Sequence, residues 1–399
     1  MIIVKSNNLV IFRSMSRKIN LSAFKMDGIV RSTAYLFLFF VLNASICVTD
    51  LGPNDPRLEN IILPEGFKIE LYAENVENAR SMVMSENNTL FIGSRGAGKV
   101  HAIPDQNGDF KADTVIAILE GLNMPNGVAL LNGALYVAEV DNVSRYENVE
   151  NDLSSLSKGV LVNDAFPDDR HHGWKYIAFG PDGKLYVPVG APCNICNESD
   201  TIYASITRMN ADGSDLEVFA HGIRNSVGFT WHPETDEMWF TDNGRDMMGD
   251  DIPNDELNHA PEQNMHFGYP FCHAGEYPDP EFGDAASCAK YTAPAQKLGP
   301  HVASLGLKFY TGSMFPEEYT GDIFIAEHGS WNRSDPIGYR ITRVHIEGNE
   351  AKNYTVFAEG WLQGNSSWGR PVDILILADG SMLVSDDSAD AIYRIYYEP

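Results

Sequence analysis

The chain has 399 residues, and 44% of them are hydrophobic, so it can bury a sizeable core and is not disordered throughout. Asp and Glu number 55 against 29 Lys and Arg, which gives a formal net charge of -26. This charge excludes sequence-independent binding to nucleic acid, which needs a basic surface, and it disfavours an anionic membrane surface as partner.

An apolar run, Ala34–Leu42, follows Arg31 and precedes a stretch of small residues that ends near Cys47. This order of charged, apolar and small segments is typical of a signal peptide, so residues 1–47 are predicted to be an N-terminal extension and signal. The run is too short for stable membrane insertion, although an uncleaved signal anchor is the alternative. We expect a secreted protein with a linker at 48–60 and one folded domain at 61–399.

Removal of the signal leaves four cysteines: Cys193, Cys196, Cys272 and Cys288. An even number in a secreted chain favours disulfides, and a zinc site would need a second C-x-x-C pair. Cys272 and Cys288 would close a loop of moderate length, and Cys193 with Cys196 could form a local bridge. Glycosylation sequons agree with a secretory route, and they stand at Asn87, Asn142, Asn197, Asn332, Asn353 and Asn365.

Short β-rich runs recur after residue 60, each preceded by a polar turn. The repeated segments are NNTLFIGS (87–94), NGALYVAE (132–139), DGKLYVPV (182–189), DEMWFTDN (236–243), GDIFIAEH (321–328) and DGSMLVSD (379–386). Their spacing is near the length of a propeller blade, apart from one long step that predicts an elaborated loop at 247–305. The sequence therefore predicts an all-β, six-bladed β-propeller, with a two-sheet sandwich as the alternative.

Reactive side chains are expected on the loops at one end of a propeller's central channel. His171 and His172 stand shortly before one repeated strand, where a neutral histidine could accept a proton from an alcohol. Arg224 and Asn225 lie in a Gly-flanked turn, and an arginine there offers a fork of donors to a carboxylate or a quinone oxygen.

Six acidic residues cluster within residues 241–258, which favours a cation such as Ca²⁺ over a merely solvated loop. Two further arginines, Arg333 and Arg370, each stand near Trp and Gly beside a repeated strand. Several cationic side chains on separate blades suggest a multiply anionic ligand in the channel.

Several motifs follow one another along about residues 60–397: LPEGFKIELYAENVENARSM, HHGWKYIAFGPDGKLYVPVG, GIRNSVGFTWHP, TDNGRD, DELN, FGYP, EHGSWNRS, GRPVD and VSDD. In this order they resemble the glucose/sorbosone dehydrogenase family, which is a family of pyrroloquinoline quinone (PQQ)-dependent, six-bladed propeller enzymes.

The resemblance implies a role for several positions of this chain. His172 looks like the general base, and Arg224 and Asn225 look like the pair near the quinone oxygens. The main-chain carbonyls of Gly244 and Arg245 look like ligands of a catalytic Ca²⁺. The remaining contacts to PQQ are expected from Asn243, Arg333 and Arg370.

Three positions depart from the soluble glucose dehydrogenases of this family. A second arginine expected two residues after Arg370 is Val372 here, and an early glutamine is matched by Pro125. Those enzymes also have a lysine beside the quinone. Arg333 replaces it here, as an arginine does in the sorbosone and fungal pyranose branch.

The resemblance implies a PQQ-dependent sugar dehydrogenase that oxidises a CH–OH group by hydride transfer to PQQ, assisted by Ca²⁺ and a histidine base. Its expected partners are a sugar and an external electron acceptor such as a cytochrome or a quinone. Two alternatives stay open at this point: a calcium-dependent propeller lactonase, and a non-catalytic secreted propeller that binds carbohydrate or protein.

Overall fold

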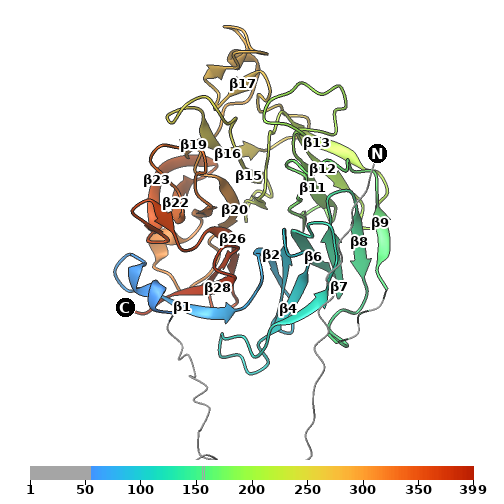
Figure 1. Ribbon diagram of the computed structural model, residues 1–399, viewed down its shortest axis with the longest axis vertical. Helices are drawn as coiled ribbons and strands as arrows, with labels where there is room; N and C mark the ends of the chain where they lie inside the picture. The colour runs from blue at the N-terminus through green and yellow to red at the C-terminus, as the bar shows by residue number, and fades with distance from the viewer. Residues whose placement is uncertain (1–54, 155, 157) are drawn as a thin grey trace, which may run out of the picture. The chain divides into compact units, whose positions relative to one another are not determined.

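The computed structural model describes residues 55–154, 156 and 158–399. The predicted signal segment and most of the predicted linker lie outside these residues. The described chain contains six four-stranded antiparallel sheets, which surround a common axis (Figure 1). The prediction of a six-bladed β-propeller is therefore confirmed.

Each of the first three blades is continuous in sequence. Blade 1 contains β2 (Ala79–Met84), β3 (Thr89–Ser94), β4 (Val100–Pro104) and β5 (Ile116–Leu119). Blade 2 contains β6 (Gly127–Leu131), β7 (Ala134–Ala138), β8 (Val143–Tyr146) and β9 (Val160–Asn163). Blade 3 contains β10 (Ala178–Phe179), β11 (Leu185–Val189), β12 (Ser205–Met209) and β13 (Glu217–His221).

The other three blades follow the same order, with an insertion in blade 4. Blade 4 contains β14 (Phe229–Trp231), β15 (Met238–Asp242), β16 (Asn254–Ala260) and β19 (Gln296–Pro300). Blade 5 contains β20 (Ser304–Phe309), β21 (Ile323–Glu327), β22 (Arg340–Glu347) and β23 (Glu350–Ala358). Blade 6 contains β26 (Pro371–Ile376), β27 (Met382–Asp386), β28 (Ala391–Tyr397) and β1 (Phe67–Glu74).

Short elements complete the described chain. They are the two-stranded pairs β17 (Cys272–His273) with β18 (Tyr277–Pro278) and β24 (Leu362–Gln363) with β25 (Ser366–Ser367), and the 3-10 helices η1 (Pro56–Asn60), η2 (Cys288–Lys290) and η3 (Glu317–Tyr319). Leu58 of η1 packs into the hydrophobic cluster between blades 5 and 6, so part of the segment expected to be a linker contacts the propeller.

The six repeated segments found in the sequence are the second strands of the six blades: β3, β7, β11, β15, β21 and β27. Every residue of these strands is buried. Neighbouring blades cover both faces of such a strand, and this explains why the apolar residues run continuously instead of alternating. The hairpin turn Asn132-Gly133 between β6 and β7 has positive φ at both residues, which suits Asn-Gly to a tight turn.

The ring is closed by the strand nearest the N-terminus. β1 pairs with β28 from Phe67 opposite Tyr397 to Glu74 opposite Ala391, so both ends of the domain share blade 6. The Phe67 ring has edge contacts with four aromatic rings, those of Phe315, Tyr319, Phe357 and Tyr397. This strand therefore joins blade 6 to the aromatic core of blade 5.

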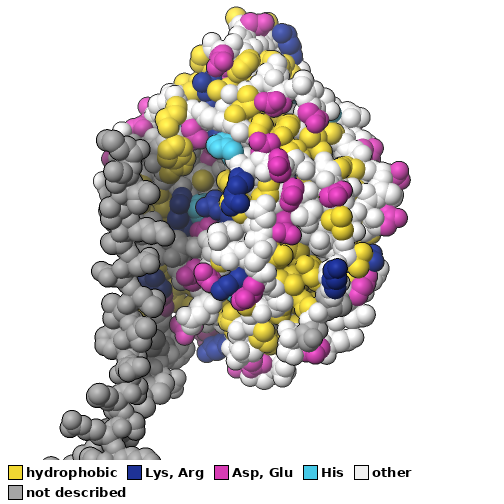
Figure 2. All heavy atoms as spheres, turned by 45° about the vertical axis from the view of Figure 1, so that its right-hand side comes forward, with side chains coloured by type: hydrophobic (Ala, Val, Ile, Leu, Met, Phe, Trp, Pro, Cys, Tyr) yellow, Lys and Arg dark blue, Asp and Glu magenta, His cyan; other side chains and the backbone are white. Residues whose placement is uncertain are grey.

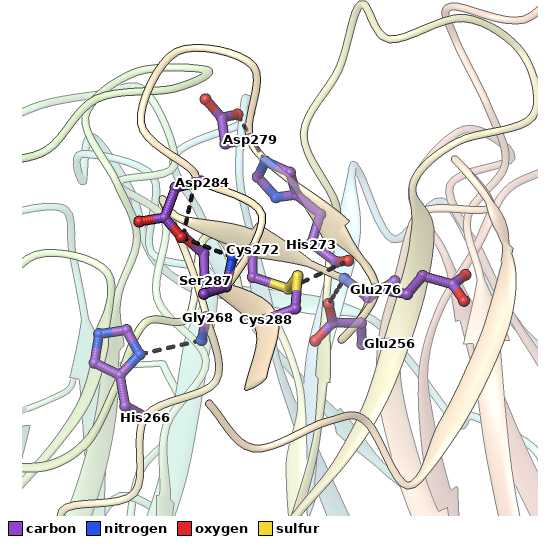
Figure 3. The surroundings of a disulfide bond; sticks show 12 residues. Glu256, His266, Gly268, Cys272, His273, Glu276, Asp279, Asp284, Ser287 and Cys288 are labelled. Carbon is purple, nitrogen blue, oxygen red and sulfur yellow. Dashed lines mark hydrogen bonds and ion pairs between the residues drawn. A yellow bond between two sulfur atoms is a disulfide. The ribbon is translucent and has the colours of Figure 1, made fainter. Parts of the chain in front are cut away.

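The interval 247–305 differs from the single loop that the sequence predicts, because β16 and β19 within it are the outer strands of blade 4. The insertion proper runs from 261 to 295 between these strands. The Cys272–Cys288 disulfide cross-links it, and the second disulfide joins Cys193 to Cys196. Figure 3 shows His273 pointing toward Asp279 beside the first of these bonds.

A small apolar cluster lies where the first strands of blades 4, 5 and 6 begin. It consists of Val227, Leu305 and Val372, with Trp174 packed against them. Val372, at the position where the resemblance expects a second arginine, is thus a core residue here. None of the helices in the described ranges is long and apolar enough to span a membrane.

Candidate functional site

A cavity of about 360 Å³ opens at one end of the propeller. Its lining comes from the loops that lead into the first strand of a blade and from the loops that follow the second strand. Figure 2 shows Lys and Arg side chains gathered at a hollow beside His side chains. The lining includes six residues predicted from the sequence: His172, Arg224, Asn225, Asn243, Gly244 and Arg370.

His172 lies in the loop between β9 and β10 and is almost fully buried. Its backbone φ is 53°, a left-handed conformation that is uncommon for a residue with a side chain and often marks a functional site. A Cβ atom on Gly190 would lie only 2.5 Å from the His172 Cβ, so the absence of a side chain at 190 makes room for the histidine. The imidazole therefore occupies one defined place in the cavity wall.

The hydrogen bond of the His172 ring fixes its tautomer. Nδ1 lies 2.9 Å from the main-chain carbonyl oxygen of Ala191, and a carbonyl oxygen can only accept. Nδ1 therefore carries the proton and Nε2 keeps its lone pair. Burial, reinforced by the charge of Arg224, lowers the pKa of His172 well below the ordinary histidine value. At neutral pH the ring is thus an uncharged proton acceptor.

Arg224 and Asn225 are held by the carboxyl group of Asp242 at the end of β15. The Arg224 N–H donates to Oδ2 at 2.8 Å, and the Asn225 N–H donates to Oδ1 at 2.6 Å. Asn243 follows directly, and its Nδ2 donates to the Asn225 carbonyl at 2.8 Å and to the Ser304 carbonyl at 3.2 Å. These bonds join three of the predicted residues into one unit of blade 4.

Gly244 and Arg245, predicted as main-chain calcium ligands, are placed differently with respect to the cavity. Gly244 lines it, and its N–H donates to Asp255 Oδ1 at 2.8 Å. Arg245 is not part of the lining; its side chain forms an ion pair with buried Asp279 in the insertion, and this contact does not involve the main-chain carbonyl for which the prediction was made. In the described part of the chain, no three His, Cys, Asp or Glu side chains converge as a metal-binding group. A calcium ion at Gly244 would therefore depend on carbonyl oxygens.

Three buried carboxyl groups lie next to the segment that contains Gly244. Burial raises the pKa of Asp242 to about 7, of Asp255 to about 6 and of Glu256 to about 8. Asp242 and Glu256 face each other across β15 and β16, and Glu256 accepts the N–H of Ala274 at 2.7 Å. The cluster thus lies next to the Gly244 segment and ties it to the insertion.

Arg370 lies on the opposite side of the cavity at the entry to β26. Its Nε donates to the His328 carbonyl at 3.0 Å and its Nη2 to the Gly329 carbonyl at 2.7 Å. Both bonds hold the guanidinium beside the loop that follows β21. Arg333, which the sequence predicts to contact the cofactor, does not line the cavity; its side chain bonds the carbonyls of Asp250 and Asp335.

Sequence reasoning missed a buried network beside Arg370. Arg80 Nη1 pairs with Asp387 Oδ2 at 2.9 Å, and His328 Nε2 lies 2.7 Å from Asp387 Oδ1. Burial lowers the pKa of His328 to about 4, so this ring is neutral and donates Nε2–H to the carboxylate. Arg80 Nε also donates to Asn126 Oδ1 at 2.7 Å, so the residue after Pro125 also supports the site.

Three further residues that were missed are Arg95, Trp174 and Asn332, all in the cavity lining. The Arg95 guanidinium stacks over the Trp174 ring at 4.8 Å and has no ion pair among the described residues. Trp174 Nε1 and Asn332 Oδ1 are buried polar atoms without a hydrogen-bond partner there. Buried polar atoms are normally satisfied, so these two atoms suggest that a polar ligand completes the cavity.

Comparisons with known proteins identify relatives of this chain. An uncharacterized protein of Borreliella burgdorferi is 35% identical over 351 residues, which cover 84% of this chain and 90% of that protein. A PQQ-dependent pyranose dehydrogenase of Coprinopsis cinerea is 22% identical, and the match covers 88% of this chain but 56% of that enzyme.

Solved structures show the same fold. The PQQ domain of the Coprinopsis cinerea pyranose dehydrogenase, in its holo form, aligns with a TM-score of 0.72 at 18% identity, over 84% of this chain and 97% of that domain. A calcium structure of a Trichoderma reesei carbohydrate-active enzyme of family AA12 has a TM-score of 0.73 at 19% identity, over 85% and 97%. The TrAA12-like family model matches residues 61–398, and the chain belongs to this family.

Proposed function

We propose that this protein is a secreted sugar oxidoreductase that uses PQQ and Ca²⁺. The observation that carries the proposal is the cavity itself, which is lined by a neutral histidine, bonded through Nδ1 to the main chain, and by four arginines. The similarity to PQQ-dependent pyranose dehydrogenase and to AA12 enzymes supports the same assignment.

The residues present fit a flat tricarboxylate. Four arginines line the cavity, Arg80, Arg95, Arg224 and Arg370, and Arg95 forms no ion pair with a carboxylate of the described residues. Trp174 Nε1 offers an additional buried donor that no described protein group uses. Guanidinium groups bind carboxylates through paired N–H donors, so these side chains would hold PQQ at the channel mouth.

When bound, PQQ would supply the two-electron acceptor that takes hydride from the sugar carbon. His172 Nε2 would accept the hydroxyl proton, while the Nδ1–H bond to Ala191 keeps the ring oriented. Asn225 and Asn243 would orient polar groups beside it. The carbonyls of Gly244 and Arg245 would hold Ca²⁺, with the Asp255 carboxyl group fixing the Gly244 peptide. The apolar cluster of Val227, Leu305 and Val372 would limit access of water to the site from this side.

The test is a dye-reduction assay on the purified full chain reconstituted with PQQ and CaCl₂, using a panel of pyranoses and other aldoses. We expect sugar-dependent dye reduction that requires both PQQ and calcium. Bound quinone without turnover on any sugar would contradict the proposal. Lactone hydrolysis without PQQ would favour a propeller lactonase, and sugar binding without PQQ uptake would favour a non-catalytic binding propeller.

A further inference from the structure

The loop between β11 and β12 reaches across to blade 4. It carries the Cys193–Cys196 disulfide, and Asn194 stands inside this small covalent ring. The loop is anchored from outside by Tyr269, whose hydroxyl accepts the Cys196 N–H at 3.0 Å and lies 3.5 Å from Cys193 Sγ. Asn194 therefore sits in a short segment whose position is fixed from two sides.

Asn194 binds the guanidinium of Arg224 at two points. Arg224 Nε donates to the Asn194 carbonyl oxygen at 2.9 Å, and Arg224 Nη2 donates to Asn194 Oδ1 at 2.8 Å. These are the two shortest of the side-chain hydrogen bonds of Arg224; those to the Asn243 carbonyl and to Asp246 are each 3.1 Å. Asn194 therefore accepts two of the four hydrogen bonds that hold this side chain, through two different oxygen atoms.

The same asparagine also fixes the loop that leaves β15. The Asp246 N–H donates to Asn194 Oδ1 at 2.9 Å, and Asn194 Nδ2 donates to the Asp246 carbonyl at 3.1 Å. Asp246 in turn accepts from Arg224 and from Asn332 Nδ2, at 3.1 Å and 2.9 Å. The network links blades 3, 4 and 5 along one edge of the cavity. Asn194 takes part in it with its main-chain carbonyl oxygen, its Oδ1 and its Nδ2.

We propose that Asn194, held in the Cys193–Cys196 ring, is a positioning residue that sets the orientation of Arg224 in the PQQ site. This inference rests on the proposed function for the identity of the ligand. A free arginine side chain has many rotamers, so fixing it before binding removes an entropic cost from ligand capture. Asn194 itself does not line the cavity, and it acts through Arg224 and Asp246.

The experiment compares wild type, Asn194→Ala, Asn194→Asp and the control Asn163→Ala. Asn163 is also half-buried and bonds the main chain, through the Gly213 carbonyl and the Ala165 N–H, but it lies on the outer strand of blade 2. We expect Asn194→Ala to weaken PQQ binding roughly ten-fold and to lower kcat with little change in sugar KM. Asn194→Asp keeps the acceptors for Arg224 and should recover most of the affinity, and Asn163→Ala should match wild type.

A second readout needs no cofactor. Hydrogen exchange in the apoprotein should be faster in peptides that cover 222–227 and 243–248 for Asn194→Ala and for Cys193→Ser/Cys196→Ser, but not for Asn163→Ala. Wild-type affinity for PQQ in Asn194→Ala, or unchanged protection in these peptides, would overturn the inference. If wild type itself takes up no PQQ, the proposed function fails, and the exchange data still decide whether Asn194 holds the Arg224 segment.

Discussion

His172 combines the features that a general base needs at neutral pH. It is neutral because it is buried next to Arg224, its tautomer is set by Ala191, and its Nε2 is not used by any described protein group. The left-handed backbone at this position is retained because Gly190 leaves room for it. The protonation state and the tautomer of His172 are thus set by its neighbours. Substitution of the histidine tests whether it acts as the base.

Replacement of His172 by alanine should lower kcat for sugar oxidation by roughly 10²–10⁴, the usual contribution of a positioned general base. PQQ affinity should change less than three-fold, because the guanidinium groups that would bind the cofactor stay in place. Stopped-flow turnover and a separate PQQ titration measure the two effects. His345→Ala, on the outer side of blade 5 where His345 pairs with Asp322, is the control and should retain wild-type turnover. Full activity in the His172 variant would remove the residue from the mechanism.

The pH dependence of kcat/KM follows from the lowered pKa of His172. A base loses activity when it is protonated, so the acidic limb of the profile reports its pKa. Because burial moves this pKa well below the ordinary value, kcat/KM should stay constant as the pH falls from 8 through about 6.5 and decrease only in more acidic buffer. An acidic limb centred at or above 6.5 would show that the ring is not buried as described.

The residues that sequence reasoning missed share one position in the repeat. Arg95, His328 and Asp387 each directly follow the second strand of a blade, as the predicted Asn243 does. Arg95 and His328 line the cavity, and Asp387 pairs with Arg80 and His328. The sequence repeat could therefore have found them, whereas the involvement of Arg245 and Arg333 in other contacts depends on the insertion and on loop packing that no repeat specifies.

At the scale of elements, the second strands were predictable and β16 was not. A second strand is apolar on both faces, whereas β16 reads Asn-Asp-Glu-Leu-Asn-His-Ala and looks like a polar loop. Its carboxyl and amide groups are nevertheless buried, because Asp255 and Glu256 accept main-chain N–H groups of neighbouring segments. Tertiary hydrogen bonds of this kind leave no signal in a hydrophobic pattern.

The insertion 261–295 should owe much of its order to the Cys272–Cys288 disulfide. Cys272→Ser/Cys288→Ser should lower the free energy of unfolding by roughly 3 kcal/mol, since the bond closes a loop with a sequence separation of 16. Calorimetric unfolding measures this loss. The matched pair Cys193→Ser/Cys196→Ser, with a separation of 3, should lose clearly less stability. Equal losses for the two pairs would contradict the loop-length argument.

At the scale of the whole molecule, the ring depends on β1. The repeat predicts six blades but does not show that the N-terminal strand completes the last one, because β1 lies more than 300 residues away from β28 in sequence. The fold class was thus predictable from local patterns, and ring closure follows from a long-range pairing that the structure shows.

Phe67→Ala in β1 should destabilise the whole propeller by about 3–5 kcal/mol, because it removes a buried ring that has edge contacts with four others. Its exposed neighbour Lys68 provides the control, and Lys68→Ala should change stability by less than about 0.5 kcal/mol. Chemical denaturation followed by tryptophan fluorescence measures both. A loss below about 1 kcal/mol for Phe67→Ala would mean that blade 6 closes without this contact.

The central claim is that the cavity binds PQQ through its arginines, and an absorbance titration of the apoprotein with PQQ, with CaCl₂ or with EDTA, tests it most directly. We predict saturable binding at one site per chain, weaker in EDTA, and at least ten-fold weaker in Arg370→Ala. The control variant Arg145→Ala removes a half-buried side chain on blade 2 that contacts Glu147 and Tyr136 and does not line the cavity, so it should bind like wild type. An absence of saturable binding, or equal affinity in the Arg370 and Arg145 variants, would contradict the account.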